Sequence, residues 1–304
     1  MKTAVLLLSY GSPEKMSDID EYLSKIFGGK PVPKGVAEEN YRKYEMFGGL
    51  SPSNRIIQSI RDRLQKRFDQ SGDVDVFTAF KHWYPSIGEV VPDLKGYDNI
   101  VSIPLFSFFS ENVKASYYKP LAEALEKNDI RTKMEFVNGI SNYDLFIPMW
   151  IHLIEEKEKG DSFYLFDAHS LPHPENEEDY LFWLRYSTYK ITQIMGLRSS
   201  DFGFQGGHEG WLGPSIYNVY RKAKEKKIIA VPISFLYDHL EILYDLDYEF
   251  RKKIEEDGYS YERVPMPNDS AIFITLLERI VSSSITHLSG ELIGNGKEKS
   301  ENFI

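Results

Sequence analysis

Short runs of apolar residues recur along the chain and alternate with longer, charged stretches that have the residue spacing of helices. The apolar runs lie at 3–9, 73–80, 99–106, 162–168 and 228–235. They are almost continuously apolar, as expected of strands that are buried on both faces of a parallel sheet. Because parallel strands need a crossover connection between them, this alternation predicts an α/β fold.

Helices are predicted in the intervening stretches, at 53–69, 115–127, 179–196, 215–226, 239–256 and 269–285. The stretch NGISNYDLFIPMW at 138–150 separates the strands into two groups, so two half-size α/β units are expected. We expect the first unit to comprise residues 1–140 with a returning helix at about 268–290, the second to comprise 141–267, and 291–304 to be a flexible tail. We find no internal sequence repeat.

The composition limits the chemistry that the chain can perform. It has no cysteine among 304 residues, which excludes disulfides, thiolate zinc sites, thiol nucleophiles and cysteine-ligated iron–sulfur clusters. The formal net charge is -10 and the basic residues are scattered among acidic ones, so nucleic acid is not expected as a partner. The apolar runs are too short to span a bilayer and no secretory signal opens the sequence, which predicts a cytoplasmic protein without a transmembrane segment.

The stretch FDAHSLP at 166–172 ends a predicted strand with His169. Ligands of α/β sheets bind at the carboxyl ends of the strands, so this imidazole is a candidate functional group. The alternative is a histidine that only caps the strand end through hydrogen bonds. His173 follows four residues later, but Pro172 would break a helix between the two histidines, so they do not form a helical zinc-binding pair.

A line of carboxylates follows the strand at 228–235, in YDHLEILYDLDYEF. Glu241, Asp245 and Glu249 recur every four residues, which places them along one face of a helix. Such a stripe is usually solvated surface, but this one begins at the sheet edge where His169 is expected. Carboxylates that lead to a neutral imidazole suit a path for protons or for a divalent metal such as Fe(II), Co(II) or Zn(II).

Two aromatic features are not assigned a role by the sequence. The glycine-rich loop FQGGHEGWLGP at 204–214 matches neither the dinucleotide fingerprint nor the phosphate loop, and we interpret it as a shaped loop that presents Trp211. Phe182 and Trp183 lie in the helix predicted at 179–196. They could serve a dimer interface or line a site, and the sequence leaves both alternatives open.

Six blocks, taken together, resemble the ferrochelatases, which insert Fe(II) into a porphyrin. They are LLLSYGSP at 6–13, YEMFGGLSPSNRI at 44–56, FKHWYPSI at 80–87, FDAHSLP at 166–172, WLGPS at 211–215 and PISFLYDHLEILYDLDYE at 232–249. The resemblance implies the chelatase fold, with two Rossmann-like domains, each a parallel sheet flanked by helices, and an active-site cleft between them. It also implies porphyrin and ferrous iron as substrates in haem biosynthesis, no prosthetic group and no iron–sulfur cluster, and transient partners of the haem pathway.

The resemblance assigns roles to single residues. His169 matches the active-site histidine and Glu241 the carboxylate opposite it, so both are expected to be catalytic and to bind the metal. Asp245 and Glu249 match the acidic line that relays metal or protons, and the division of labour between His169 and Glu241 stays open. The expected porphyrin contacts are Tyr10, Lys43, Tyr44, Ser51 and Tyr117, and the residues expected to support the site are Lys81, His82 and Trp211.

Coproporphyrin III, which would give coprohaem, is the favoured substrate. Tyr10 resembles the tyrosine that contacts the metal from the other face in the coproporphyrin III group, where many protoporphyrin enzymes have an apolar residue. Phe27 and Gly28 depart from that group, which tends to have arginines there, and Lys43 replaces a common arginine by a point charge. The alternative substrate is protoporphyrin IX. A cobalt or nickel chelatase acting on sirohydrochlorin, with His82 as its second histidine, and a non-catalytic haem or metal carrier are further alternatives.

Overall fold

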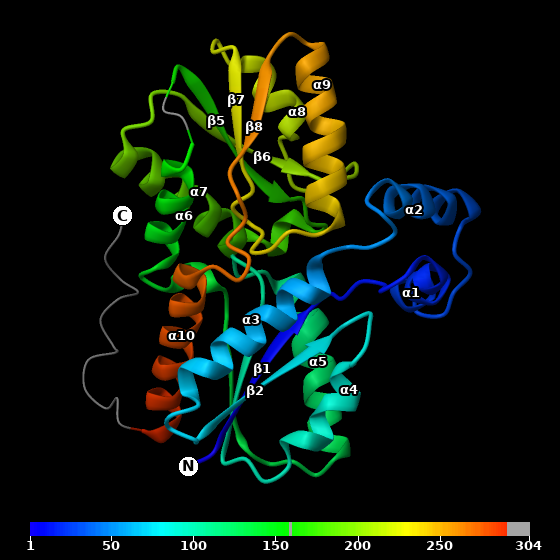
Figure 1. Ribbon diagram of the computed structural model, residues 1–304, viewed down its shortest axis with the longest axis vertical. Helices are drawn as coiled ribbons and strands as arrows, with labels where there is room; N and C mark the ends of the chain where they lie inside the picture. Colours follow the sequence, from blue (N-terminus) through cyan, green and yellow to red (C-terminus); the bar gives the residue numbers. More distant parts are fainter. Residues whose placement is uncertain (158–159, 291–304) are drawn as a thin grey trace.

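The computed structural model describes residues 1–157 and 160–290, which form two α/β domains placed end to end (Figure 1). Each domain is built on a four-stranded parallel sheet, with strand order β2-β1-β3-β4 in the first and β6-β5-β7-β8 in the second. This arrangement confirms the predicted class of two parallel sheets flanked by helices. The predicted tail at 291–304 lies outside the described residues.

The first sheet has its most buried strand in the middle. Its strands are β1 (Thr3–Ser9), β2 (Val74–Phe80), β3 (Asn99–Pro104) and β4 (Lys133–Phe136). All residues of β1 are buried, because strands flank it on both sides and helices cover both faces. Alternate side chains therefore enter two cores: Val5 and Leu7 pack with α3 (Ser53–Phe68) and α10 (Ala271–Ser289), and Leu6 and Leu8 pack with α4 (Ile87–Val90) and α5 (Glu111–Lys127).

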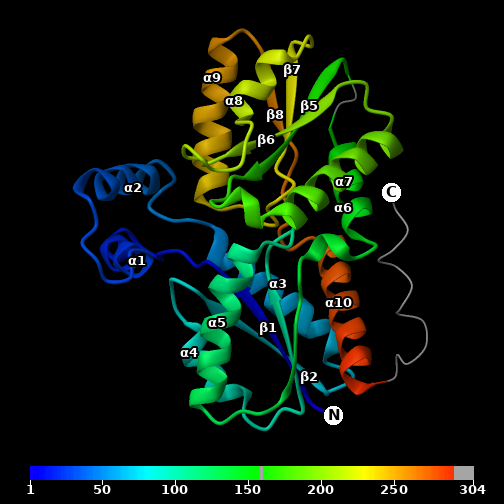
Figure 2. The same ribbon diagram turned by 180° about the vertical axis from the view of Figure 1, so that it is seen from behind.

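The helix α10 comes from the far end of the described chain and lies beside α3 against the first sheet (Figure 2). Its side chains Phe273, Leu277 and Val281 are fully buried there. Within the described ranges it is the one helix that is long and apolar enough to cross a membrane by those two criteria, and its packing accounts for that composition. The packing of α10 on the first domain is what the predicted returning helix requires. The domain boundaries stay a prediction.

The second sheet consists of β5 (Ser162–His169), β6 (Ser200–Gln205), β7 (Lys227–Val231) and β8 (Ser260–Arg263). On one side of it lie α6 (Phe146–Glu155) and α7 (Glu178–Met195), and on the other α8 (Ile216–Val219) and α9 (Arg251–Glu256) (Figure 1). A π-helix over Ile242–Phe250 precedes α9, where the sequence predicts an α-helix at 239–256. The remaining elements are α1 (Ile19–Ile26), α2 (Lys34–Met46) and short 3-10 turns at Met16–Asp18, Val91–Leu94, Ile140–Asn142, Pro174–Asn176 and Tyr220–Lys222.

The apolar pattern does not detect three of the strands, β4, β6 and β8, and all three are edge strands. Their sequences KMEF, SDFGFQ and SYER carry polar residues, because an edge strand is covered less completely than an inner one. The pattern also misses α1, α2, α4 and α6. The helix predicted at 215–226 is wrong in length, since α8 ends at Val219 and only a single 3-10 turn follows it.

The two domains repeat one framework, although we find no internal repeat from the sequence alone. In each, the phenylalanine near the end of the second strand donates its backbone N–H to a proline carbonyl at 2.9 Å, Phe80 to Pro85 and Phe204 to Pro214. Both prolines follow a cis peptide bond, and both begin the tripeptide Pro-Ser-Ile that opens a short helix. Ser9 pairs with Phe80, and Ala168 pairs with Phe204, so the next residues, Tyr10 and His169, hold equivalent positions.

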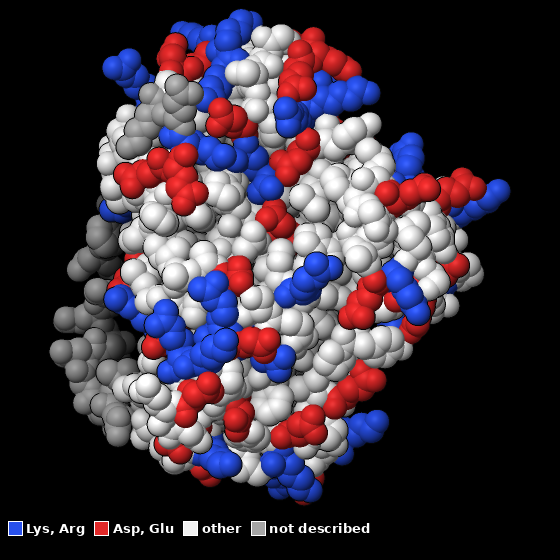
Figure 3. Space-filling model, viewed as in Figure 1, with Lys and Arg blue, Asp and Glu red and all other residues white. Residues whose placement is uncertain are grey.

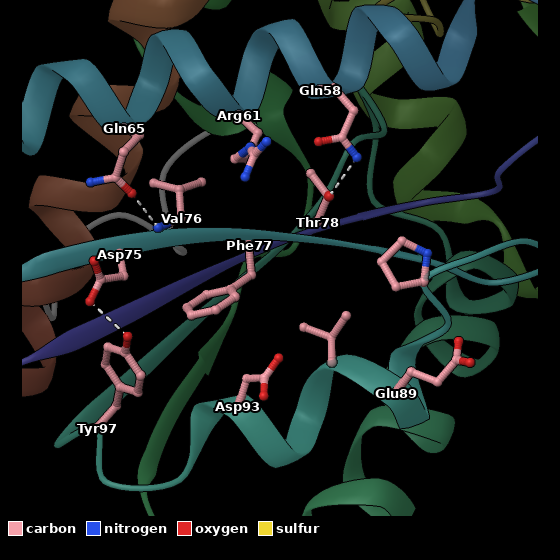
Figure 4. Close-up of a pocket in the computed structure, with 12 residues that line it drawn as sticks. Gln58, Arg61, Gln65, Asp75, Val76, Phe77, Thr78, Glu89, Asp93 and Tyr97 are labelled. Atoms are coloured by element: carbon pink, nitrogen blue, oxygen red, sulfur yellow. Dashed lines mark hydrogen bonds between the residues drawn. The ribbon is translucent and has the colours of Figure 1, made fainter.

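The outer edge of the first sheet is closed by side chains of α3 (Figure 4). The amide of Gln65 donates to the carbonyl of Val74 (3.0 Å) and accepts the N–H of Val76 (2.7 Å), and Gln58 donates to Thr78 Oγ1 (3.1 Å). The two bonds of Gln65 satisfy backbone groups that an open edge strand would offer to another chain. A pocket of about 520 Å³ lies along this edge, between α3 and α4, away from the carboxyl ends of the strands.

Candidate functional site

The carboxyl ends of β1 and β5 point toward each other at the junction of the two domains (Figure 1). In both sheets the strand order reverses at this inner strand, which is where α/β sheets bind ligands. Residues of both domains meet here: the hydroxyl oxygens of Ser9 and Tyr237 are 2.9 Å apart. The side chains of His169 and Glu241 are 32% and 51% exposed, so solvent reaches the junction.

His169 is the last residue of β5, and its backbone is held on both sides. Its N–H donates to Ser234 Oγ (3.0 Å), and its carbonyl accepts the hydroxyl of Tyr180 (3.0 Å). Ring Nδ1 contacts the carbonyl oxygen of Ser170, which can only accept a hydrogen bond, so Nδ1 carries the proton of the neutral ring. Nε2 is therefore the atom with a free lone pair.

Glu241 faces this lone pair. Its Oε2 lies 3.8 Å from Nε2 of His169, which is too long for a hydrogen bond. A neutral imidazole nitrogen and an ionised carboxylate oxygen are both acceptors, so a proton or a cation between them is needed for attraction. Because bonds from zinc to such nitrogen and oxygen atoms are about 2.0–2.2 Å long, one divalent ion could reach both atoms.

A second imidazole, from His239, lies on the other side of Glu241. Its Nε2 is 3.5 Å from Glu241 Oε2, and its Nδ1 is 3.0 Å from the carbonyl oxygen of Tyr237. The spacing of residues in the sequence does not single out His239, because residues two apart do not share a helical face and Glu241 is two residues further on. The structure resolves this: helical geometry begins at Leu240, so His239 belongs to the preceding loop.

In the acidic line, the pKa values of Glu241 and Asp245 are shifted in opposite directions. Partial desolvation would raise the pKa of Glu241, but the hydrogen bond to His239, the imidazoles of His169 and His239 in their protonated forms, and the ammonium of Lys43 lower it to about 2. Burial raises the pKa of Asp245 to about 6, with Lys43 opposing and the like charges of Glu241 and Glu249 adding to the shift. Glu241 is thus ionised near neutral pH, whereas Asp245 exchanges a proton near pH 6. Glu249 is exposed beyond them.

Tyr10 approaches the site from the first domain. Burial and the charge of Glu241 raise its pKa to about 12, so its hydroxyl stays protonated. Its ring packs on His82 with centroids 4.5 Å apart, and the ammonium of Lys81 lies 5.8 Å from its centroid. Burial and the charge of Lys81 lower the pKa of His82 to about 4, against a backbone hydrogen bond near Lys25. A neutral, aromatic wall therefore stands opposite the ionised groups of the second domain.

Lys43 joins the two domains. Its ammonium on α2 lies 3.3 Å from Asp245 and 3.1 Å from Glu39, and 4.5 Å from the centroid of the Tyr244 ring. It is expected to bind the porphyrin, but in this structure both acidic partners already hold it. A porphyrin carboxylate would have to compete with Asp245 for the same cation.

Several of the expected porphyrin contacts lie below the surface. Tyr44 and Tyr117 are 2% and 1% exposed, and within residues 1–157 and 160–290 the hydroxyl of Tyr117 has no hydrogen-bond partner. Ser51 is buried and donates to Ser53 Oγ (3.0 Å). Trp211 packs against His208 with ring centroids 4.9 Å apart, at the start of the turn that leads to α8. Contact of Tyr44, Ser51 and Tyr117 with a porphyrin stays a prediction, as does the supporting role of Trp211.

The structure reveals two further residues at the site that the sequence analysis does not identify. Asp167 is fully buried, and its carboxyl oxygens have no hydrogen-bond partner among the described residues. Burial, with the charges of Asp245 and Glu241, raises its pKa well above the usual range. Gly206, with φ +69, lies so close to His169 that a Cβ would be 2.9 Å from Nε2. The signals in the sequence were an acid within an apolar strand and a glycine directly after β6.

Within the described ranges, no three His, Asp or Glu side chains converge closely enough to form a metal-binding cluster. The described conformation brings together a pair, His169 and Glu241, that is open to solvent. A site of this kind can hold a divalent ion between a neutral nitrogen and an ionised oxygen while neighbouring groups take up protons, which is the chemistry of a metal chelatase.

A family model described as Ferrochelatase matches residues 2–285. The chain belongs to this family, and it is therefore an enzyme of haem biosynthesis that acts on ferrous iron and a porphyrin. A ferrochelatase of Thermoplasma acidophilum is 64% identical over 293 residues, a match that covers 96% of this chain and 94% of that protein.

Other relatives carry a substrate in their names. The coproporphyrin III ferrochelatase of Bacillus subtilis is 30% identical over 303 residues, covering 92% of this chain and 97% of that protein. Among solved structures, the cobalt complex of the sirohydrochlorin chelatase SirB from Bacillus subtilis subspecies spizizenii has a TM-score of 0.62 at 12% identity, covering 94% of this chain and 97% of that chain. At that identity the likeness supports the chelatase fold alone.

Proposed function

We propose that the porphyrin substrate is coproporphyrin III. The observation that carries this proposal is Lys81, a partly buried cation beside Tyr10 that has no acidic partner within ion-pair distance in the described part of the chain. Burial lowers the pKa of Lys81, because its ammonium is poorly solvated there. An anion beside it would replace the missing solvation, so the two charges would attract strongly. Coproporphyrin III carries four carboxylates and protoporphyrin IX two, and additional carboxylates need additional cations.

Two further observations bear on the substrate. The resemblance of Tyr10 to the tyrosine of the coproporphyrin III group favours this porphyrin, as do the names of relatives at about 30% identity, such as that of Bacillus subtilis. The Thermoplasma relative, at 64% identity, has no substrate in its name. Protoporphyrin IX is therefore the second candidate.

We propose the following division of labour. Insertion breaks two pyrrole N–H bonds, forms four iron–nitrogen bonds and releases two protons. His169 accepts pyrrole protons at Nε2, whose lone pair is free, and ionised Glu241 holds the entering Fe(II). Asp245, whose pKa of about 6 lies near neutral, passes protons outward to Glu249 and solvent.

The test compares initial rates of iron insertion with coproporphyrin III and protoporphyrin IX at equal concentrations. We expect a preference for coproporphyrin III, and Lys81→Met should reduce kcat/KM for coproporphyrin III by about tenfold, with a smaller loss for protoporphyrin IX. The matched control is Lys119→Met on the exposed face of α5. A preference of the native enzyme for protoporphyrin IX would overturn the substrate proposal and leave the ferrochelatase assignment intact.

We also propose that the enzyme works in the cytoplasm and hands its product to transient partners of the haem pathway. The burial of α10 against the first sheet supports a cytoplasmic location, since its apolar face is already covered by protein. Fractionation of cells should recover the enzyme without detergent, and recovery only from the membrane fraction would contradict this proposal.

A further inference from the structure

The outward face of α7 carries a row of aromatic side chains. Phe182, Tyr186 and Tyr189 are 56%, 39% and 60% exposed, and their spacing of four and three residues places them on one face of the helix. The rings of Phe182 and Tyr186 stack with centroids 6.1 Å apart, and Trp183 packs edge-on against both. On the opposite face of α7, Tyr180 is buried and bonds to the backbone of the catalytic strand. The aromatic row therefore points away from the metal site and has no role there.

Charged side chains on α7 flank this row and have no partner of opposite charge among the described residues. Glu178 and Asp179 lie in the first turn. Arg185 and Lys190 lie further along, and the ammonium of Lys190 contacts only the ring of Tyr186, at 5.5 Å from its centroid. The helix thus carries unpaired negative charge at its start and unpaired positive charge in its middle and second half. Two such helices placed antiparallel are complementary to each other.

We propose that this face of α7 is the interface of a homodimer, with a twofold axis that passes between the two α7 helices at the level of residue 184. Residues at equal distances before and after the axis then lie opposite each other, because the interface of a twofold dimer is self-complementary. Phe182 of one copy meets Tyr186 of the other, and Glu178 of one copy meets Lys190 of the other.

The aromatic row and its flanking charges match a second copy of the chain better than they match a membrane surface. Aromatic residues and arginine are the types enriched at the centres of protein interfaces. A membrane surface is anionic and would repel Glu178 and Asp179, which border the row. A contiguous apolar patch rimmed by polar residues is uncommon on the surface of a monomer.

The dimer is tested by light scattering after size-exclusion chromatography and by sedimentation velocity over a range of protein concentrations. We expect the native enzyme to be a dimer and Phe182→Glu to be monomeric, with iron insertion retained because the row is remote from His169. Tyr118→Glu, at a tyrosine of α5 that is 41% exposed, is the matched control and should stay dimeric.

A charge exchange tests the register of the two helices. Glu178→Lys should weaken the dimer by about tenfold in Kd, and adding Lys190→Glu to the same chain should restore it, since the two positions are predicted to face each other. A monomeric native enzyme at every concentration overturns the proposal, as does a dimer that Phe182→Glu leaves unchanged. A monomer that sediments with anionic vesicles would also overturn it and would assign the row to a membrane. If Phe182→Glu fails to fold, the charge exchange decides, and a double variant that is no tighter than Glu178→Lys counts against the interface.

Discussion

The two domains share a frame and differ in the residues at its open edge. When their second strands are aligned at Phe80 and Phe204, Tyr10 of the first domain corresponds to His169 of the second. One position thus carries a neutral phenol in the first domain and an imidazole with a free lone pair in the second. Strand order determines where a side chain can face the junction of the domains. In the proposed mechanism, the residue at that strand end decides which domain takes up protons.

The neighbours of these two rings differ as well. His82 of the first domain corresponds to Gly206 of the second, because both stand two residues beyond the aligned phenylalanines. His82 packs on Tyr10, with ring centroids 4.5 Å apart, and closes that side of the ring. Gly206 has no side chain, so the Nε2 side of His169 stays open. A bulky neighbour therefore covers the ring in the first domain, whereas a missing side chain leaves Nε2 of the ring uncovered in the second.

The strongest test of this comparison alters the side chain at each of the two equivalent ring positions. His169→Ala should reduce iron insertion by about a hundred- to ten-thousandfold, because it removes the proton acceptor. Tyr10→Phe should change the rate only a few-fold, because its phenol stays protonated. Absorbance of the metallated porphyrin gives both rates, and circular dichroism checks folding. Similar losses in the two variants would show that the domains contribute equally to the chemistry.

Gly206→Ala tests the open side of His169. A Cβ would approach Nε2 to 2.9 Å, and φ of +69 adds backbone strain, so we expect about a tenfold loss of activity and about 1–2 kcal/mol of stability. Gly72→Ala is the matched control, because Gly72 has φ +67 and nothing within 4 Å of its Cβ position. It should lose similar stability and no activity. Equal activity losses would mean that backbone strain alone causes the effect.

Leu8 and Asp167 hold equivalent buried positions, two residues before Tyr10 and His169. Substitutions there test how each domain interior tolerates a carboxyl. Asp167→Asn should stabilise the protein by about 1–3 kcal/mol at pH 7, because burial raises the pKa of the carboxyl and folding at that pH must protonate it or bury its charge, a cost that a neutral amide does not carry. Since the pKa of Asp167 is raised, the carboxyl is tolerated in its protonated form at low pH, and the gain should vanish in acid. Urea unfolding at the two pH values measures both effects. Leu8→Asp should be strongly destabilising, and a loss of stability in Asp167→Asn at pH 7 would contradict the argument.

Of the two described domains, only the second carries the acidic line of Glu241, Asp245 and Glu249. Its carboxyls predict that the stability of the protein depends on pH. The pKa of Asp245 rises from 3.8 to about 6 on folding, so its contribution to stability is present below pH 3.8 and is lost as pH rises through about 6. That of Glu241 falls from 4.5 to about 2, so its contribution is present above 4.5 and is lost as pH falls toward 2. Asp245→Asn should remove at most about 2 kcal/mol of pH dependence between pH 4 and 6, which thermal unfolding at several pH values can detect. An unchanged profile would mean that Asp245 is ionised throughout.

The sequence predicts the parts of this molecule that are governed by burial. The inner strands β1, β3, β5 and β7 are almost continuously apolar, and the sequence places His169 at the end of β5. The edge strands β4, β6 and β8 are polar and escape the pattern, whereas the edge strand β2 is apolar enough to be detected. The repeat between the domains is one of backbone pairing, of which only Pro-Ser-Ile survives as sequence. His239 and Gly206 act through close approach in three dimensions, to Glu241 and His169, which no spacing along the chain encodes.

The position of α10 has a consequence for folding during synthesis on the ribosome. This helix covers the first sheet but is made after residues 137–270, a stretch that contains the entire second sheet. At ribosomal rates of about 5–20 residues per second, the incomplete first domain waits for about 7 to 27 seconds after β4 has emerged. During that time the apolar groove beside α3 is open to solvent. A ribosome-bound chain stalled before residue 271 should therefore be a chaperone client, and release of the final helix should end that dependence.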